Sequence, residues 1–153
     1  MKSNPPPPAA GEGKRGEEGY LGYLLRQAAH AYRQRQERAL ADISLTPPQF
    51  AVLTMVNAYP GASGADLARL AVLTPQTMNV IVKNLLRAGL LDRAPDATHG
   101  RILNLRLTES GGTVLAAARR RVMVLEDELS KGLDEGKKAD LRLWLAAVAR
   151  GRD

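Results

Sequence analysis

The sequence predicts a mainly helical protein with one small β-wing, arranged as a winged helix-turn-helix domain flanked by further helices at both ends. The central observation is a short helical segment that begins at Thr74-Pro75 and ends at Gly89, preceded by another short helical segment and a tight turn. A turn-containing segment with alternating apolar residues then runs to Thr108, as a β-hairpin would. Apolar stripes before residue 46 and after residue 108 predict the flanking helices.

The composition indicates a folded, soluble chain without disulfides. Its 153 residues suit one domain or one subunit of a symmetric dimer; 44% are hydrophobic and 25% are charged. Cysteine is absent, which excludes a disulfide and a switch based on thiol oxidation. There is no apolar run of about 18 residues and no apolar core of a signal peptide, so we expect no membrane partner and a cytoplasmic location.

The net charge of +6 is unevenly spread along the chain. Residues 60–107 contain six basic and three acidic side chains, an excess of +3, whereas residues 1–19 balance to zero. A basic excess over the central segment favours a phosphate-binding surface. Taken alone, the same charge also fits a moderately basic soluble protein that binds no nucleic acid.

The N-terminal part divides into a tail and a helix. Residues 1–19 are rich in proline, glycine and charge, and we expect a disordered tail. A helix is predicted from about Tyr20 to Asp42, and residues 20–45 form a dimerisation helix in this interpretation. Its apolar stripe recurs at helical spacing and comprises Leu21, Leu24, Leu25, Ala28 and Tyr32.

Residues 46–108 are predicted to form the winged helix-turn-helix domain. Within it, three residues with hydroxyl side chains mark the starts of helices. Thr46 precedes Pro47, a residue that fits the first helical turn, and this helix stops over residues 57–61. Ser63 begins a third helix and Thr74 begins a fourth, which Gly89 terminates. The third and fourth helices are short and separated by a tight turn.

The fourth helix has one apolar and one polar face. Met78, Ile81, Val82, Leu85 and Leu86 would point inward. On the outward face, the first turns carry amide and hydroxyl groups, which suit hydrogen bonds to base edges. The cations further along the helix suit phosphates, and the valine suits contact with a thymine methyl. An ordinary amphipathic helix with a solvated polar face has the same pattern. The candidate DNA contacts here are Thr74, Gln76, Thr77, Asn79, Val80, Lys83 and Arg87.

The segment after Gly89 predicts two strands and a projecting loop. Residues 90–93 read as a strand, residues 94–100 as a loop, and residues 103–107 as a second strand with period-two alternation. Arg101 would lie at the base or tip of this wing, and arginine suits a narrow minor groove. The alternative is a solvent-exposed strand charge.

Two helices follow the wing, and residues 109–153 are predicted to form C-terminal dimerisation helices. Thr108 caps the first, whose heptad-like stripe runs from Leu115 to Leu129. The second spans about Glu135 to Val148 and carries Trp144 among its apolar residues. Since these stripes lie outside the small central domain, we expect them to meet a second subunit in a homodimer. The run of residues 119–121, all arginine, is either a solvated helix surface or a phosphate contact.

This order of elements resembles the MarR family of bacterial transcription regulators over about residues 20–150. The resemblance is carried by the segments LTPPQFAVL (45–53), ADLAR (65–69), TPQT (74–77), LLRAGLL (85–91) and LRLT (105–108). It implies a homodimeric repressor on a pseudo-palindromic operator in double-stranded DNA. Each recognition helix would enter a major groove, and each wing would reach a flanking minor groove.

The resemblance also implies further site residues. The family wing usually contains Asp-x-Arg, and the matching residues here are His99-Gly100-Arg101. The arginine is kept, and His99 replaces the aspartate. His99 either contacts a phosphate, in which case protonation would strengthen the contact, or lies exposed in the loop without a role. Many members bind a small aromatic or anionic effector. The pocket candidates here, each of which also suits plain packing, are Tyr23, His30, Tyr32 and Met55.

Two other classes of function would leave different signs in the sequence. The sequence has no glycine-rich phosphate loop after a strand, no metal-spaced ligand cluster and no catalytic constellation, so we expect no enzyme, cofactor or metal site. A winged-helix module for protein contacts remains the alternative. Its binding face should be more apolar than the polar stripe of the fourth helix.

Overall fold

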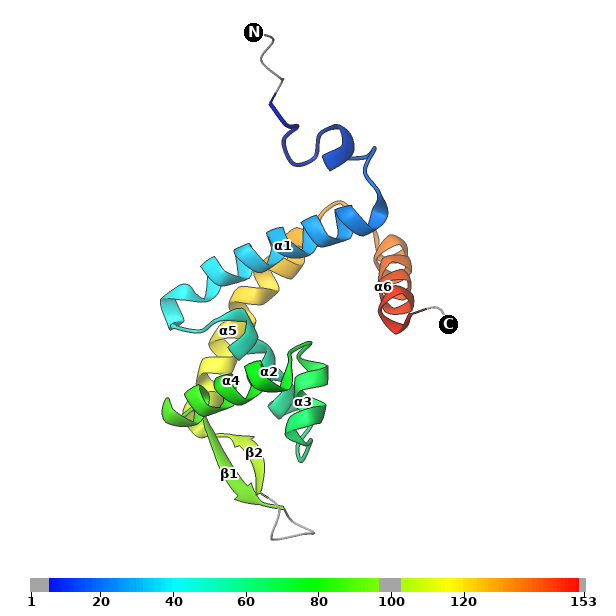
Figure 1. The fold of residues 1–153 in the computed structure, drawn as a ribbon. Helices are drawn as coiled ribbons and strands as arrows, with labels where there is room; N and C mark the ends of the chain where they lie inside the picture. The colour runs from blue at the N-terminus through cyan, green and yellow to red at the C-terminus, as the bar shows by residue number, and fades with distance from the viewer. Residues whose placement is uncertain (1–5, 97–102, 152–153) are drawn as a thin grey trace.

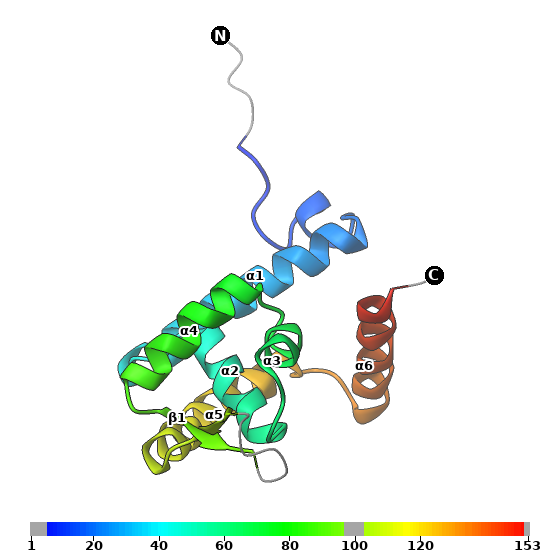
Figure 2. The same cartoon turned by 60° about the horizontal axis from the view of Figure 1, so that its bottom comes forward.

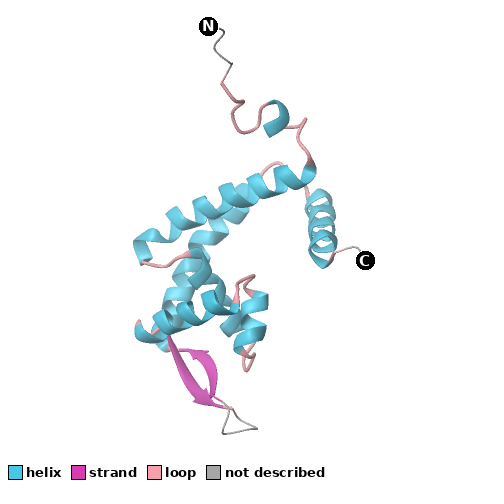
Figure 3. Cartoon of the chain, in the orientation of Figure 1, coloured by secondary structure: helices cyan, strands magenta, loops and turns pink. Residues whose placement is uncertain are grey.

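The computed structural model describes residues 6–96 and 103–151, and within them the chain is mainly helical with one two-stranded sheet. Figures 1 and 3 show the long first helix crossing the long helix that follows the hairpin; the shorter helices lie below this crossing, and the hairpin projects at the far end. The elements are α1 (Leu21–Leu40), α2 (Pro47–Ala58), α3 (Gly64–Leu70), α4 (Pro75–Arg87), β1 (Leu91–Pro95), β2 (Leu103–Leu107), α5 (Glu109–Leu129) and α6 (Glu135–Arg150).

Side-chain caps begin the helices where the sequence predicts them. Thr46 and Gln49 form a reciprocal capping box, in which the Thr46 N–H donates to Gln49 Oε1 at 2.9 Å. The hydroxyl oxygens of Ser63 and Thr74 accept backbone N–H bonds at 3.1 and 3.2 Å at the starts of α3 and α4. Each such cap satisfies a backbone donor that the helix cannot and contributes about 1 kcal/mol.

One apolar core joins the first five α-helices. Each of these helices contributes a fully or almost fully buried leucine, and these leucines are Leu40, Leu53, Leu67, Leu85 and Leu115. Full burial of a leucine contributes roughly 1.5–3 kcal/mol. Because α4 and α5 share this core, α4 and the root of the hairpin are held against the same group of packed helices.

The structure corrects two predicted boundaries. The loop predicted to start at Ala94 starts later, because Ala94 and Pro95 continue β1 and pair with Asn104 and Leu103. Pro95 is tolerated because a two-stranded sheet consists only of edge strands, where a proline can occupy the strand end. The first helix ends at Leu40 rather than Asp42, and a 3₁₀ turn over Ala41–Ile43 leads to the connection with α2.

The described part of the N-terminal segment has local structure that its composition did not predict. A 3₁₀ turn spans Gly13–Arg15. Arg15 Nε donates to Gln27 Oε1 at 3.0 Å, and Gln27 Nε2 donates back to the Arg15 carbonyl at 3.0 Å. These bonds attach the segment to the first turns of α1.

Helix α6 stands apart from the other helices in both views (Figures 1 and 2). It nevertheless carries large apolar side chains, with Leu143 69% exposed and Trp144 42% exposed. In the described part of the chain no single helix is long and apolar enough to span a membrane, although α1 with its 3₁₀ extension and α2 together, as a bent pair, meet that test of length and composition.

Candidate nucleic-acid interface

Helix α4 is fixed in rotation by its apolar face. Met78, Ile81, Val82 and Leu85 are buried in the common core, and Leu86 is half-buried beside them. Residues three and four apart share a helix face, so burial of this face turns the intervening positions to solvent. The predicted inward face of the fourth helix is therefore confirmed.

The opposite face of α4 carries the predicted candidate contacts. All seven are exposed, and Val80 is 60% exposed despite its apolar side chain. The two threonines also contact each other, because the Thr74 hydroxyl accepts the Thr77 N–H and donates to Thr77 Oγ1 at 2.9 Å. Thr74 is thereby used by the helix itself, whereas Gln76 and Asn79 present their amides outward.

The turn between α3 and α4 contains a strained residue that is not among the predicted site residues. Val72 has φ 55° and is 90% exposed. A β-branched residue rarely adopts this left-handed conformation. The turn is held by backbone bonds, including one from the Leu73 N–H to the Ala68 carbonyl at 2.8 Å. The signal in the sequence was a valine at a tight helix-to-helix turn, where glycine would cost least.

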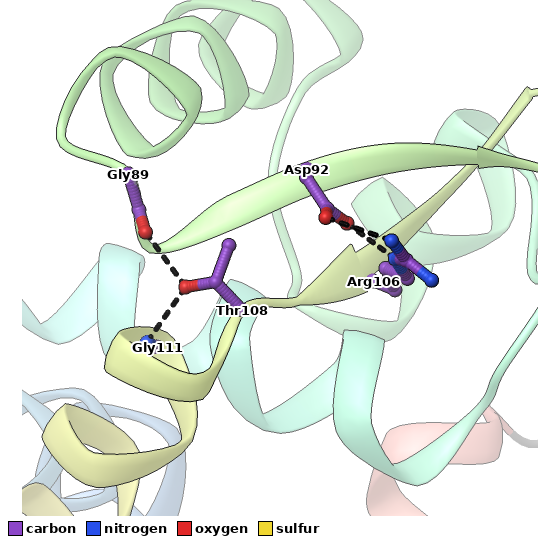
Figure 4. Close-up of polar contacts among 5 residues, drawn as sticks. All are labelled: Gly89, Asp92, Arg106, Thr108 and Gly111. Atoms are coloured by element: carbon purple, nitrogen blue, oxygen red, sulfur yellow. Dashed lines mark hydrogen bonds and ion pairs between the residues drawn. The ribbon is translucent and has the colours of Figure 1, made fainter.

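The wing, formed by β1, β2 and their connection, carries a cross-strand ion pair. Arg106 donates from Nε to Asp92 Oδ1 at 2.6 Å and from Nη2 to Oδ2 at 3.0 Å (Figure 4). The two residues lie directly opposite each other in the antiparallel register. The hydrogen bonds from Arg106, and secondarily its charge, hold the pKa of Asp92 below its ordinary value.

The root of the wing is tied to both neighbouring helices through one hydroxyl. Thr108 Oγ1 donates to the Gly89 carbonyl at 2.6 Å and accepts the Gly111 N–H at 2.9 Å (Figure 4). The Thr108 N–H also donates to the Leu90 carbonyl at 3.2 Å. A single residue therefore joins the end of α4, the start of β1 and the first turn of α5.

Gly111 permits this junction and is not among the residues that the sequence predicts for the site. A Cβ at residue 111 would lie 2.0 Å from the Leu90 carbonyl oxygen, a distance that no real contact reaches. The available signal was a pair of glycines in the first turns of a helix, where glycine costs about 1 kcal/mol relative to alanine. A glycine in such a position often indicates that another part of the backbone approaches too closely for a side chain.

His99 and Arg101 lie outside the described residues. By sequence they fall between the end of β1 at Pro95 and the start of β2 at Leu103. Their assignment as DNA contacts stays a prediction.

Arg121 differs from its two arginine neighbours. It donates to both carboxylate oxygens of Asp42, at 3.1 Å from Nε and 2.8 Å from Nη2, and so connects α5 to the turn before α2. These bonds lower the pKa of Asp42. Arg119 and Arg120 are exposed, so the run is divided between one paired cation and two solvated ones.

The four predicted effector residues are distributed over α1 and α2. Tyr23 lines a cavity of about 380 Å³ with residues of the N-terminal segment, while Met55 packs against the common core. His30 is exposed. The Tyr32 hydroxyl donates a hydrogen bond to Glu126 of α5. The pKa of Tyr32 is raised, mainly because the hydroxyl is partly buried and also because of its bond to this carboxylate. The effector pocket stays a prediction.

A larger cavity of about 570 Å³ lies where α1 ends and α2 begins. It is lined by Arg33, Glu37, Ala41, Ser44, Leu45, Thr46, Pro47 and Pro48, a set that contains none of the predicted effector residues. Over residues 6–96 and 103–151, no group of three or more histidine, aspartate or glutamate side chains is arranged to hold a metal ion.

Comparison with known proteins places these features in a family. A family model described as the MarR family matches residues 43–102. The HTH-type transcriptional repressor Rv2887 of Mycobacterium tuberculosis is 39% identical over 125 residues, which cover 82% of this chain and 90% of the relative. The predicted resemblance is thereby confirmed.

Two solved structures share the fold. Rv2887 in complex with salicylic acid superposes with a TM-score of 0.69 and 32% identity, covering 85% of this chain and 96% of that chain. The S. aureus MepR–DNA complex superposes with a TM-score of 0.76 and 26% identity, covering 85% of this chain and 94% of that one. The chain therefore belongs to the MarR family and is a DNA-binding transcriptional repressor with a winged helix-turn-helix fold.

Proposed function

We propose that the chain acts as a homodimer on a pseudo-palindromic operator, with α4 of each protomer in a major groove and each wing at a flanking minor groove. The observation that carries this proposal is the exposed polar stripe of α4, which the buried opposite face holds in one orientation. A stripe of amides followed by cations matches the order of base edges and phosphates that a helix meets in a groove.

The roles within the interface follow from the chemistry of each side chain. Gln76 and Asn79 read base edges, since an amide can both donate to and accept from adenine. Lys83 and Arg87 contact phosphates, Thr77 offers a hydroxyl, and Val80 meets a thymine methyl. His99 and Arg101 contact the flanking DNA from the wing. Thr74 acts mainly by capping α4, which orients the first turn.

Dimerisation is assigned to residues 20–45 and 109–153. The support is the exposed apolar surface of α6, a helix that stands away from the rest of its own chain. Trp144, the single tryptophan, reports on this surface. We expect its fluorescence emission to shift to longer wavelength as the protein is diluted and the dimer dissociates. Emission that does not change over a dilution range in which ultracentrifugation detects dissociation would remove α6 from the interface.

Small aromatic acids are the proposed effectors. The relative Rv2887 has been solved with salicylic acid. For release of this repressor from DNA, the acid must bind more tightly to a dimer whose two reading helices are wrongly spaced, because equal affinity for both states shifts nothing. Salicylate should therefore weaken operator binding, and operator DNA should weaken salicylate binding by the same factor. We expect this regulation to operate in the cytoplasm, where the operator DNA is.

Selection of bound sequences from random duplex DNA tests the operator. We expect enrichment of an inverted repeat whose half-sites are about one helical turn apart, roughly 10 base pairs. Affinity for the selected site should fall steeply with salt because phosphate contacts release counterions. A folded, dimeric protein that enriches no repeat would contradict the proposal and favour a protein-contact module.

Gln76→Ala tests the reading role of α4. On the selected operator this change should cost about 1–3 kcal/mol and relax the preference at one base pair in each half-site. Asn57→Ala is the matched control, because Asn57 is an exposed amide on α2, outside both the proposed DNA contacts and the segments assigned to dimerisation. Equal effects of the two changes would show that Gln76 reads no base.

A further inference from the structure

A second side-chain link crosses the wing near its far end. Asn104 Nδ2 donates to Asp96 Oδ2 at 2.7 Å, and both residues are partly buried. An amide that donates to a carboxylate makes a charge-assisted bond, which is stronger than a bond between neutral groups. Neither residue was among the predicted site residues.

The strand register explains why these side chains meet. Asn104 lies opposite Ala94, so Asp96 is its diagonal neighbour on the same face of the hairpin. Pro95, between them, has no N–H to donate to the ladder. The ladder ends at the pair Pro95–Leu103, and the Asn104–Asp96 bond adds a side-chain link between the two strands there. The Asp92–Arg106 pair joins them nearer the root.

Asn104 also lies against the body of the domain. A Cβ added to Gly61 would be 3.6 Å from Asn104 Nδ2, so the carboxamide lies beside the turn between α2 and α3. Gly61 has φ +82°, a conformation that suits glycine in such a turn. One carboxamide thus bonds to Asp96, just beyond the end of β1, and lies beside the turn between α2 and α3.

We propose that Asn104 is a positioning residue that holds the end of β1 beside the start of β2, and so orients the wing for DNA, before DNA arrives. This inference rests on the proposed contact between the wing and flanking DNA. When these strand ends are already held in place, less conformational freedom is lost on binding, and more of the contact energy appears as affinity. Asn104 acts through Asp96 and the helical body and touches no DNA itself.

The test compares two duplexes that contain the selected operator. One ends at the outer edges of the half-sites, and the other extends on each side by about half a helical turn, roughly five base pairs. Wild-type protein should bind the longer duplex more tightly. Asn104→Leu should weaken binding to the longer duplex about tenfold, equivalent to about 1.4 kcal/mol, and leave binding to the shorter one unchanged.

Two further variants make the outcome decisive. Asn104→Asp has the same shape and places a carboxylate against Asp96, so it should give the same loss without leaving a cavity. Asn57→Ala removes an exposed amide from α2 and should change neither affinity. The inference is overturned if the Asn104 variants keep the wild-type preference for the longer duplex, or if they lose affinity equally for both. A wild-type protein indifferent to duplex length would instead refute the wing contact itself.

Discussion

Replacing Gly111 by alanine should disrupt the junction between the wing and α5. The added Cβ would lie 2.0 Å from the Leu90 carbonyl oxygen and 2.9 Å from its carbon, so the start of α5 or of β1 must move by more than 1 Å. Such overpacking costs roughly 3 kcal/mol, and loosening of the Thr108 cap costs about 1 kcal/mol. The better helix propensity of alanine offsets about 1 kcal/mol.

The expected net effect is a loss of about 3 kcal/mol in the free energy of unfolding. For a chain of this length that lowers the melting temperature by roughly 6–12 °C. Urea unfolding followed by circular dichroism measures it, with every protein at one concentration because dimer stability depends on concentration.

Gly112→Ala is the matched control in the same helical turn. A Cβ at residue 112 meets nothing within 4 Å, so the change should stabilise the protein by about 1 kcal/mol through helix propensity alone. The reasoning is refuted if Gly111→Ala unfolds at the same urea concentration as wild type, or if both variants shift in the same direction. Either result would mean that α5 does not begin against Leu90.

Two further predictions concern Val72 and Asp92. Val72→Gly should stabilise the fold by about 1 kcal/mol, because glycine relieves the left-handed strain and a side chain this exposed loses little packing; a lower urea midpoint would contradict this. The lowered pKa of Asp92 means that its pair with Arg106 stabilises the protein above the unfolded pKa of about 3.9, and that this stability is lost as pH falls through the folded pKa. The gap in melting temperature between wild type and Asp92→Asn should therefore shrink as pH falls below about 4, and an ordinary Asp92 pKa in an NMR titration would exclude that explanation.

The helix starts and the outward face of α4 were predictable because they depend on local signals. A hydroxyl followed by proline, as at Thr46 and Thr74, indicates a helix start within a few residues of sequence. The face of α4 follows from a 3.6-residue period that local sequence displays directly. The strand β2 was likewise predictable, because apolar residues alternate with polar ones over residues 103–107.

The features that sequence did not predict depend on contacts between distant segments. The place of Gly111 depends on a carbonyl 21 residues earlier, and Arg121 pairs with a carboxylate 79 residues away. The extension of β1 through Pro95 opposed a local signal, since proline and aspartate together indicate a loop. Strand pairing with β2 overrode that preference. The left-handed backbone of Val72 likewise follows from how α3 and α4 pack in the common core.

Helix α5 has a geometric consequence for regulation, because its two ends belong to different parts of the molecule. Its first turn supports the wing through Gly111, and its last turns contact α1 through Glu126 and Tyr32. A helix of 21 residues is roughly 30 Å long. If the whole helix rotates by about 5° about its carboxyl end, its amino end and the wing root are displaced by roughly 3 Å. Subtle rearrangement near α1 can thus move the wing by nearly the width of a base-pair step.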